Sequence, residues 1–89
     1  MKAIVTVVGK DQVGIIAAVA NSLAEFNVNI LDISQTVMQG YFTMMMVVEV
    51  SACTIPVAAL SVRVEEMGKE KGLSIRVQRE DIFEAMHRI

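Results

Sequence analysis

Residues 9 to 19 read Gly9-Lys10-Asp11-Gln12-Val13-Gly14-Ile15-Ile16-Ala17-Ala18-Val19, a charged turn bounded by two glycines and set between two apolar runs. Glycine lacks a Cβ, so Gly9 and Gly14 permit backbone conformations and close approaches that other residues block. Backbone amides in the first turn of the following helix have no intrahelical acceptor and can receive a carboxylate or a phosphate. The stretch therefore predicts a strand, a turn open to a ligand, and a helix, and it leaves the ligand unidentified.

The size and composition of the chain limit its class. Its 89 residues fit a single domain spanning 1–89, because little chain is left over for a second core. Apolar residues make up 54% and charged residues 20%, and no apolar run approaches the ~18 residues of a membrane span. Lys10 and Asp11 interrupt the apolar start before it reaches the length of a secretory signal. We therefore expect a cytoplasmic protein that does not bind membranes.

The charge and the reactive residues argue against several activities. A net charge of −2 provides no basic field for a phosphate backbone, so we expect no direct nucleic-acid binding. Cys53 and His87 are each the only residue of their type, which argues against an internal disulfide or a metal site. No serine has an identifiable base partner, and no spacing singles out a pair of acidic residues. We expect no catalytic residue, no cofactor and no enzymatic activity.

The spacing from Gly9 to Gly14 equals that of a phosphate-binding loop. However, Ile15 and Ile16 stand where such a loop needs Lys and Ser or Thr for phosphate and magnesium. A nucleotide triphosphatase is therefore disfavoured. From the residues alone, a helix-entry turn with no ligand is an equal alternative.

Apolar periodicity predicts the elements of the first half. Residues 2–8 favour a strand, and residues 12–26 favour a helix capped by Asp11, with apolar positions at Ile15, Ile16, Val19, Leu23 and Phe26. Strands are predicted over 30–38 and 41–50, joined by a two-residue hairpin at Gln39-Gly40. Alternation in the latter strand puts one set of side chains on a common face: Phe42, Met44, Met46, Val48 and Val50.

The second half repeats this order. Thr54 is a candidate cap and Pro56 a first-turn residue of a helix carried by Val57, Leu60, Val64 and Met67 and ending near Gly72. Leu73, Ile75 and Val77 then alternate with polar residues, which predicts a last strand. A short C-terminal helix is predicted after Asp81, with Ile82, Met86 and Ile89 on one face.

The predicted order is strand, helix, strand, strand, helix, strand. This is the α+β, ferredoxin-like βαββαβ sandwich, with a four-stranded antiparallel sheet, two helices on one face and the short C-terminal helix added. In that topology the second strand lies at an edge of the sheet. Its unpaired backbone groups offer a place for a second copy to bind, so we expect a homodimer.

A family resemblance rests on the glycine-bounded turn together with Asn27-Val28-Asn29-Ile30-Leu31-Asp32-Ile33-Ser34-Gln35 and the ending Ile82-Phe83-Glu84-Ala85-Met86. In these motifs, and over almost its whole length, the chain resembles the ACT domain, a regulatory module that commonly binds amino acids. It is especially similar to the small stand-alone ACT proteins of the UPF0237 family.

The resemblance implies a ligand site between two copies of the domain. On one side it places the turn after the first strand, and on the other the start of the second strand from a neighbouring copy. In this chain the corresponding residues are Asp11, Gln12, Val13, Gly14 and Ile15, with Asn29 and Ile30 opposite. The amides of Val13 and Ile15 would meet a carboxylate, Asp11 would accept from an ammonium group, and Asn29 would donate and accept.

The function implied by the resemblance is regulatory. A non-catalytic homodimer would bind an amino acid or similar small metabolite and signal to a protein partner. Two alternatives stay open: a protein–protein assembly module that needs no ligand, and a small ferredoxin-like enzyme. The identity of the ligand is also open, because some amino-acid-binding ACT domains carry His at the position of Gly9 and Asn at that of Asp11.

Overall fold

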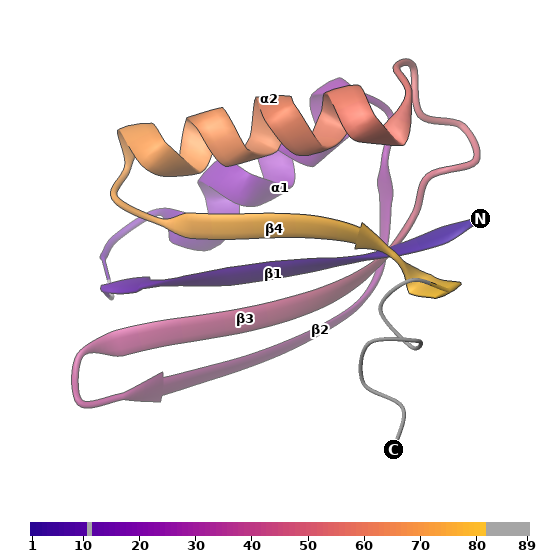
Figure 1. The fold of residues 1–89 in the computed structure, drawn as a ribbon. Coiled ribbons are helices and arrows are strands. Elements are labelled where there is room, and N and C mark those ends of the chain that lie inside the picture. The colour runs from indigo at the N-terminus through magenta and orange to yellow at the C-terminus, as the bar shows by residue number, and fades with distance from the viewer. Residues whose placement is uncertain (11, 82–89) are drawn as a thin grey trace.

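Six elements follow one another along the chain in the computed structural model, which describes residues 1–10 and 12–81 (Figure 1). In order they are β1 (Lys2–Lys10), α1 (Ile15–Glu25), β2 (Asn29–Met38), β3 (Tyr41–Glu49), α2 (Val57–Glu70) and β4 (Ser74–Arg79). The predicted C-terminal helix over 82–89 lies outside the described residues. The predicted βαββαβ order is confirmed.

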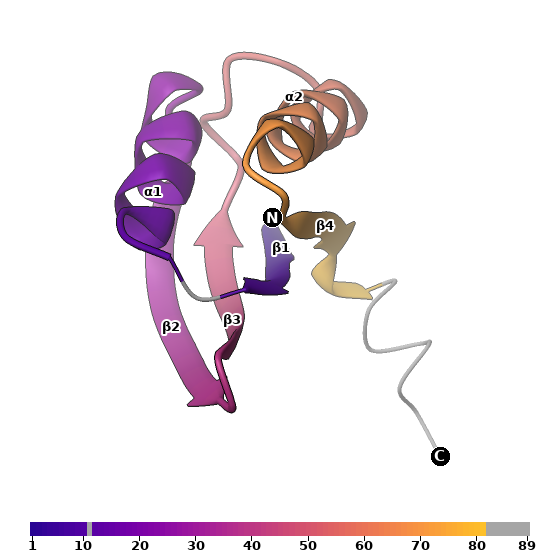
Figure 2. The same ribbon diagram turned by 90° about the vertical axis from the view of Figure 1, so that its left-hand side faces the viewer.

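The strands form one antiparallel sheet in the order β2-β3-β1-β4. Both helices lie on the same face of this sheet, with α1 above the β2 side and α2 above the β4 side (Figure 2). The prediction of a ferredoxin-like sandwich is therefore confirmed. β2 and β4 are the two edge strands.

Side chains on one face of β3 fill the space between the sheet and the helices. The five side chains predicted to share a face, from Phe42 to Val50, are all buried. They pack in one cluster with Val19 and Leu23 from α1 and with Leu60 and Val64 from α2. Because strand side chains have a period of two and helix side chains a period near 3.6, these patterns identify the core.

The start of α1 differs from the prediction. The helix begins at Ile15 rather than near Gln12, and its N-cap is Gly14, with φ 86° and ψ 7°. A residue in this left-handed conformation cannot be part of a right-handed helix, so Gln12 to Gly14 are loop. Ile16, predicted to be on the apolar face, is 42% exposed.

The start of α2 also differs. The N-cap is Pro56, with φ −59° and ψ 149°, and no side chain in the described part of the chain caps this end by a hydrogen bond. Thr54 was therefore the wrong choice of cap, because it lies two residues before the N-cap. Instead, the backbone N–H of Thr54 donates to the carbonyl of Phe26 at 3.0 Å, which ties the loop before α2 to the end of α1.

The end of α2 is where the sequence placed it. Lys71 is the C-cap, and Gly72 follows with φ 73°. The amide of Leu73 donates to the carbonyl of Gly68 at 2.8 Å, and that of Gly72 to the carbonyl of Lys69 at 3.2 Å. This is the glycine-terminated Schellman arrangement, which satisfies helix-end carbonyls.

β2 is unlike the other strands. Asn29 and all residues from Leu31 to Met38 are exposed, although β3 beside it is buried on one face. Ile33 and Val37 pair in register with the buried Met46 and Phe42, yet they are 42% and 55% exposed. The helices therefore leave the outermost strand of the sheet largely uncovered.

Candidate functional site

The two glycines of the predicted loop have different roles. Gly9 lies within β1, and a Cβ there would come within 2.6 Å of Leu73 Cδ2 and 3.3 Å of the Gly72 carbonyl oxygen. Gly14 has open space around it, but its φ is 86°. Gly9 is thus required by packing against the turn before β4, and Gly14 by the backbone conformation that begins α1.

The loop offers free backbone donors to solvent. Among residues 1–10 and 12–81, no side chain caps α1, and the first intrahelical bond runs from the amide of Ala18 to the carbonyl of Gly14 at 2.9 Å. The amides of Ile15 to Ala17 precede that bond and so lack a helical acceptor. Val13 is fully exposed, at 103% of its reference area. The amides at the start of α1 are those that the sequence predicts to receive an anion.

Two further residues of the predicted site have tasks within their own chain. Ile15 is 4% exposed, so its side chain belongs to the core and only its backbone faces the loop. The side chain of Gln12 reaches the C-terminal end of α2, where its Nε2 donates to the carbonyl of Lys71 at 3.0 Å. Asp11 lies outside the described residues.

Asn29 and Ile30 lie at the opposite end of the sheet from the loop. Asn29 is level with Glu49 and, through it, with Lys2, whereas Lys10 is level with Tyr41 and Met38. At about 3.3 Å per residue, the eight steps from Lys2 to Lys10 correspond to roughly 26 Å. One chain therefore does not bring the two halves of the predicted site together.

A β-bulge, which the sequence did not indicate, lies beside Asn29. The pairing of β2 with β3 shifts between Ile30 and Asp32, so Leu31 is the extra residue on β2. No glycine or proline marks the position, and Leu31 is 47% exposed. Bulges redirect neighbouring side chains and are common at sheet edges.

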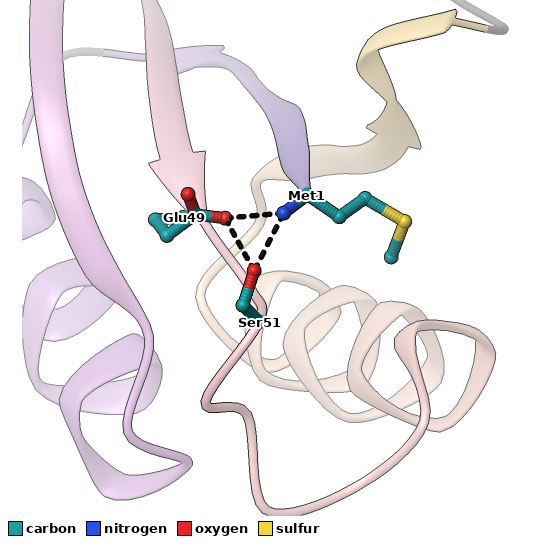
Figure 3. Close-up of polar contacts among 3 residues, drawn as sticks. All are labelled: Met1, Glu49 and Ser51. Carbon is teal, nitrogen blue, oxygen red and sulfur yellow. Dashed lines mark hydrogen bonds and ion pairs between the residues drawn. The ribbon is translucent and has the colours of Figure 1, made fainter.

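A polar cluster lies at the same end of the sheet as Asn29. The N-terminal ammonium of Met1 donates to Glu49 Oε2 at 2.8 Å, and the Ser51 hydroxyl donates to the same oxygen at 3.0 Å (Figure 3). These hydrogen bonds, first from the N-terminus and then from Ser51, lower the pKa of Glu49. The Glu49 carboxylate is thus engaged within its own chain.

Two hollows that are lined by described residues lie away from the predicted site. A groove of about 460 Å³ runs between α1 and α2, and its lining includes Ser22, Phe26, Arg63 and Lys71 but no predicted site residue. A smaller hollow of about 200 Å³ lies at β2 and β3, lined by Asp32, Ile33, Ser34, Met45 and Val47.

The described residues offer no assembled metal site and no membrane helix. Within residues 1–10 and 12–81, no three His, Cys, Asp or Glu side chains gather closely enough to hold a metal ion. Neither α1 nor α2 has the length and apolar character needed to cross a bilayer.

Comparison with known proteins identifies the family. The model of the ACT domain family matches residues 2–78. A UPF0237 protein of Clostridium acetobutylicum is 52% identical over 89 residues, covering all of both chains. Among solved structures, an ACT domain protein from Streptococcus pneumoniae is similar with a TM-score of 0.82 and 48% identity, over 98% of each chain.

A more distant structure shares the fold. The regulatory subunit of aspartate kinase from Thermus thermophilus, in its ligand-free form, has a TM-score of 0.69 and 24% identity, covering 89% of this chain and 51% of that one. The chain belongs to the ACT domain family and, within it, to the UPF0237 proteins.

Proposed function

We propose that this protein is a non-catalytic regulatory domain that binds an amino acid or a similar small metabolite between two copies of itself. The supporting observation is the separation of the site in one chain, combined with the uncovered edge at β2. The loop lies at one end of the sheet and Asn29 at the other. A second copy can close that separation.

Antiparallel pairing of two β2 strands about a two-fold axis joins the halves. In such a pair, the start of one strand lies beside the end of the other. The partner's Asn29 then lies at the Met38 end of β2, which is level with the end of β1 and with the loop that follows. Each dimer has two equivalent sites, and each takes its loop from one copy and its Asn29 from the other.

Exposed apolar side chains border the same edge. Ile33 and Val37 project from β2 on the side of the helices, and Ile16 lies in the first turn of α1, which covers that side of the sheet (Figure 2). All three are at least 42% exposed in one copy. Burying them against a second copy would favour association, because removing apolar surface from water stabilises by about 25 cal/mol per Å².

The chemistry of both halves suits a zwitterion. The free amides at the start of α1 favour a carboxylate, and the positive end of the helix dipole adds to this. The side-chain amide of Asn29 both donates and accepts, so it can bind either the ammonium or the carboxylate group. A ligand held by two copies binds the dimer better than the monomer and shifts the population accordingly. That shift is the regulatory signal, passed on to a protein partner.

The first experiment is a thermal-shift screen of the proteinogenic L-amino acids and glycine, with light scattering on the same samples. We expect a dimer and a rise in Tm with at least one of them. A saturating ligand at 100 times its Kd adds about 2.7 kcal/mol to the free energy of unfolding. A monomer at every accessible concentration would refute the shared site.

Subunit mixing tests the intersubunit geometry. Gly14→Val should block the loop, and Asn29→Ala should remove a polar partner at about 1 to 3 kcal/mol of binding free energy. A heterodimer of the two variants contains one wholly intact site and one doubly altered site. We therefore expect the mixed sample to regain binding, measured by calorimetry with the amino acid that stabilises the wild type.

The controls separate binding from folding. Val13→Ala keeps the backbone amide and should lower affinity less than either site variant. Circular dichroism and light scattering on each variant confirm that it folds and pairs, because Val at a φ of 86° strains the loop. Failure of the mixed dimers to regain binding would place the site elsewhere.

A second candidate function is a ligand-independent assembly module. The observation favouring it is the sheet face opposite the helices, where Val8, Met38, Tyr41 and Met45 are 41 to 68% exposed. Groups of exposed apolar residues of this kind often mark protein–protein contacts. A stable complex with another protein, unaffected by every amino acid in the screen, would support this function over the first.

A further inference from the structure

Gln12 joins two parts of the fold that lie 59 positions apart in the chain. Its side-chain Nε2 donates to the backbone carbonyl of Lys71 at 3.0 Å. Lys71 is the C-cap of α2, so the contact runs from the loop before α1 to the last turn of the other helix. Both segments lie at the end of the sheet where β1 stops and β4 begins (Figure 1).

The acceptor belongs to a tightly built turn. The amides of Gly72 and Leu73 close the end of α2 by donating to Lys69 and Gly68. Directly beneath, Gly9 packs so closely on Leu73 that a Cβ would lie 2.6 Å from the leucine Cδ2. The chain is therefore held to this turn at two points, by packing at Gly9 in β1 and by the hydrogen bond from Gln12 in the loop.

We infer that Gln12 is a positioning residue which couples the ligand loop to the C-terminal end of α2, and that its side chain is not a ligand contact. The inference deepens the proposed function and rests on it for the role of the loop. The side-chain Nε2 of Gln12 donates to the Lys71 carbonyl, while the neighbouring Val13 is fully exposed and Gly14 has open space beside it.

This coupling connects the proposed ligand site to a second surface, the groove between α1 and α2. Lys71 also lines the groove between α1 and α2. A ligand that fixes the loop in this conformation stabilises the Gln12–Lys71 hydrogen bond and with it the last turn of α2. By linkage, anything that steadies that turn raises the affinity of the loop for its ligand by the same factor.

The test begins with ligand-free protein and compares substitutions of similar size. Gln12→Met keeps the length but has no donor, and Gln12→Arg keeps a donor that can reach the carbonyl. We expect amide hydrogen exchange at Gly72 and Leu73 to be about five-fold faster in Gln12→Met, the equivalent of one ordinary hydrogen bond, and close to wild type in Gln12→Arg. The amide resonance of Gly14 should shift in Gln12→Met as well. Unchanged exchange and an unmoved Gly14 resonance would overturn the inference.

A pH profile separates hydrogen bonding from packing. In Gln12→Glu the introduced carboxylate cannot donate and faces the negative end of α2, whereas its protonated form can donate. The NMR shift of the Lys71 carbonyl carbon should therefore return toward its wild-type value as pH falls, with a midpoint above the ordinary glutamate pKa of about 4.3 because the negative helix end disfavours the carboxylate. The wild type and Gln12→Met should show no such titration. A titration-free Gln12→Glu would contradict the role of the side chain.

The ligand arm uses the individual L-amino acids of the thermal-shift screen. An amino acid that stabilises the wild type should slow exchange at Leu73, and this slowing should be lost in Gln12→Met. Direct contact of Gln12 with the ligand would instead abolish binding in Gln12→Met and in Gln12→Arg alike, which would refute the positioning role. If no amino acid binds, the proposed function fails, while the ligand-free measurements still decide whether Gln12 holds the loop to α2.

Discussion

At the scale of single residues, the same amino acid meets different constraints a few positions apart. Gly9 has an ordinary strand conformation and must lack a Cβ because Leu73 and Gly72 lie against it. Gly14 and Gly40 have free space but φ values of 86° and 82°. Substitutions at these glycines should fail for separate reasons, by steric overlap at Gly9 and by backbone strain at the other two.

The β2–β3 hairpin contains a residue with an unfavourable conformation. Gln39 has φ 50° and Gly40 has φ 82°, the two positive values of a type I′ turn. Left-handed backbone costs most L-residues roughly 1 to 2 kcal/mol, and asparagine tolerates it better. Gln39→Asn should therefore raise the free energy of unfolding by about 0.5 to 1 kcal/mol, measured by urea denaturation.

The control for the hairpin is Gln39→Val. A β-branched side chain disfavours positive φ more strongly than glutamine does, so this variant should lose stability. An Asn variant no more stable than the wild type would contradict the assigned cost of the turn.

At the scale of elements, α2 packs closely on β4 because one of its buried residues has no side chain. Gly68 is buried in α2, and a Cβ there would lie 2.8 Å from Ile75 Cγ1 and 3.1 Å from the Leu73 carbonyl oxygen. Helix propensity favours alanine over glycine by about 1 kcal/mol, but overpacking costs about 1 to 3 kcal/mol. Because one of the obstructing atoms is backbone, we expect Gly68→Ala to destabilise by about 1 kcal/mol, measured by denaturant unfolding.

Val62→Ala is the matched control on the same helix. Val62 is 55% exposed, so the substitution changes helix propensity with little effect on packing. It should be neutral or raise stability by a few tenths of a kcal/mol. A stabilised Gly68→Ala would show that α2 can move away from β4 at little cost.

The start of β1 is joined to the end of β3 by a charge-dependent contact. The N-terminal ammonium and Ser51 lower the pKa of Glu49 below its ordinary value of 4.5, so the folded state favours the carboxylate (Figure 3). The resulting stabilisation is present above pH 4.5 and is lost as pH falls through the lower folded-state value. We expect the wild type to exceed Glu49→Gln in stability above that pH and the difference to shrink below it, in unfolding curves at a series of pH values. A difference independent of pH would contradict this.

At the scale of the whole molecule, the exposed β2 edge distinguishes a dimer from a monomer. Val37 on β2 and Val62 on α2 are both 55% exposed, which makes them a matched pair. Val37→Lys should weaken self-association at least about ten-fold, or 1.4 kcal/mol, because it places a charge in the proposed interface. Val62→Lys should leave association unchanged. Light scattering over a concentration series gives the dissociation constant of the dimer for each variant. Equal effects of the two substitutions would show that β2 is not part of the interface.

The sequence by itself determined the order of elements, the buried face of β3, the Gln39-Gly40 hairpin and the end of α2 at Gly72. Each of these depends on a local pattern: a side-chain period, or a residue type that tolerates positive φ. The family was also readable from the sequence, because its motifs are continuous segments. The prediction of the helix caps was less accurate. A side chain such as that of Thr54 can cap a helix only if the backbone at that point enters the helix.

Only the tertiary structure decided where the predicted site residues lie relative to one another. It separated Asn29 from the loop by the length of the sheet, because β1 and β2 run in the same direction on either side of β3. It left β2 exposed on both faces, and it directed the side chain of Gln12 to Lys71. These features join residues far apart in the chain. Their physical cause is the packing of whole elements against one another, which has no counterpart in the local spacing of residues.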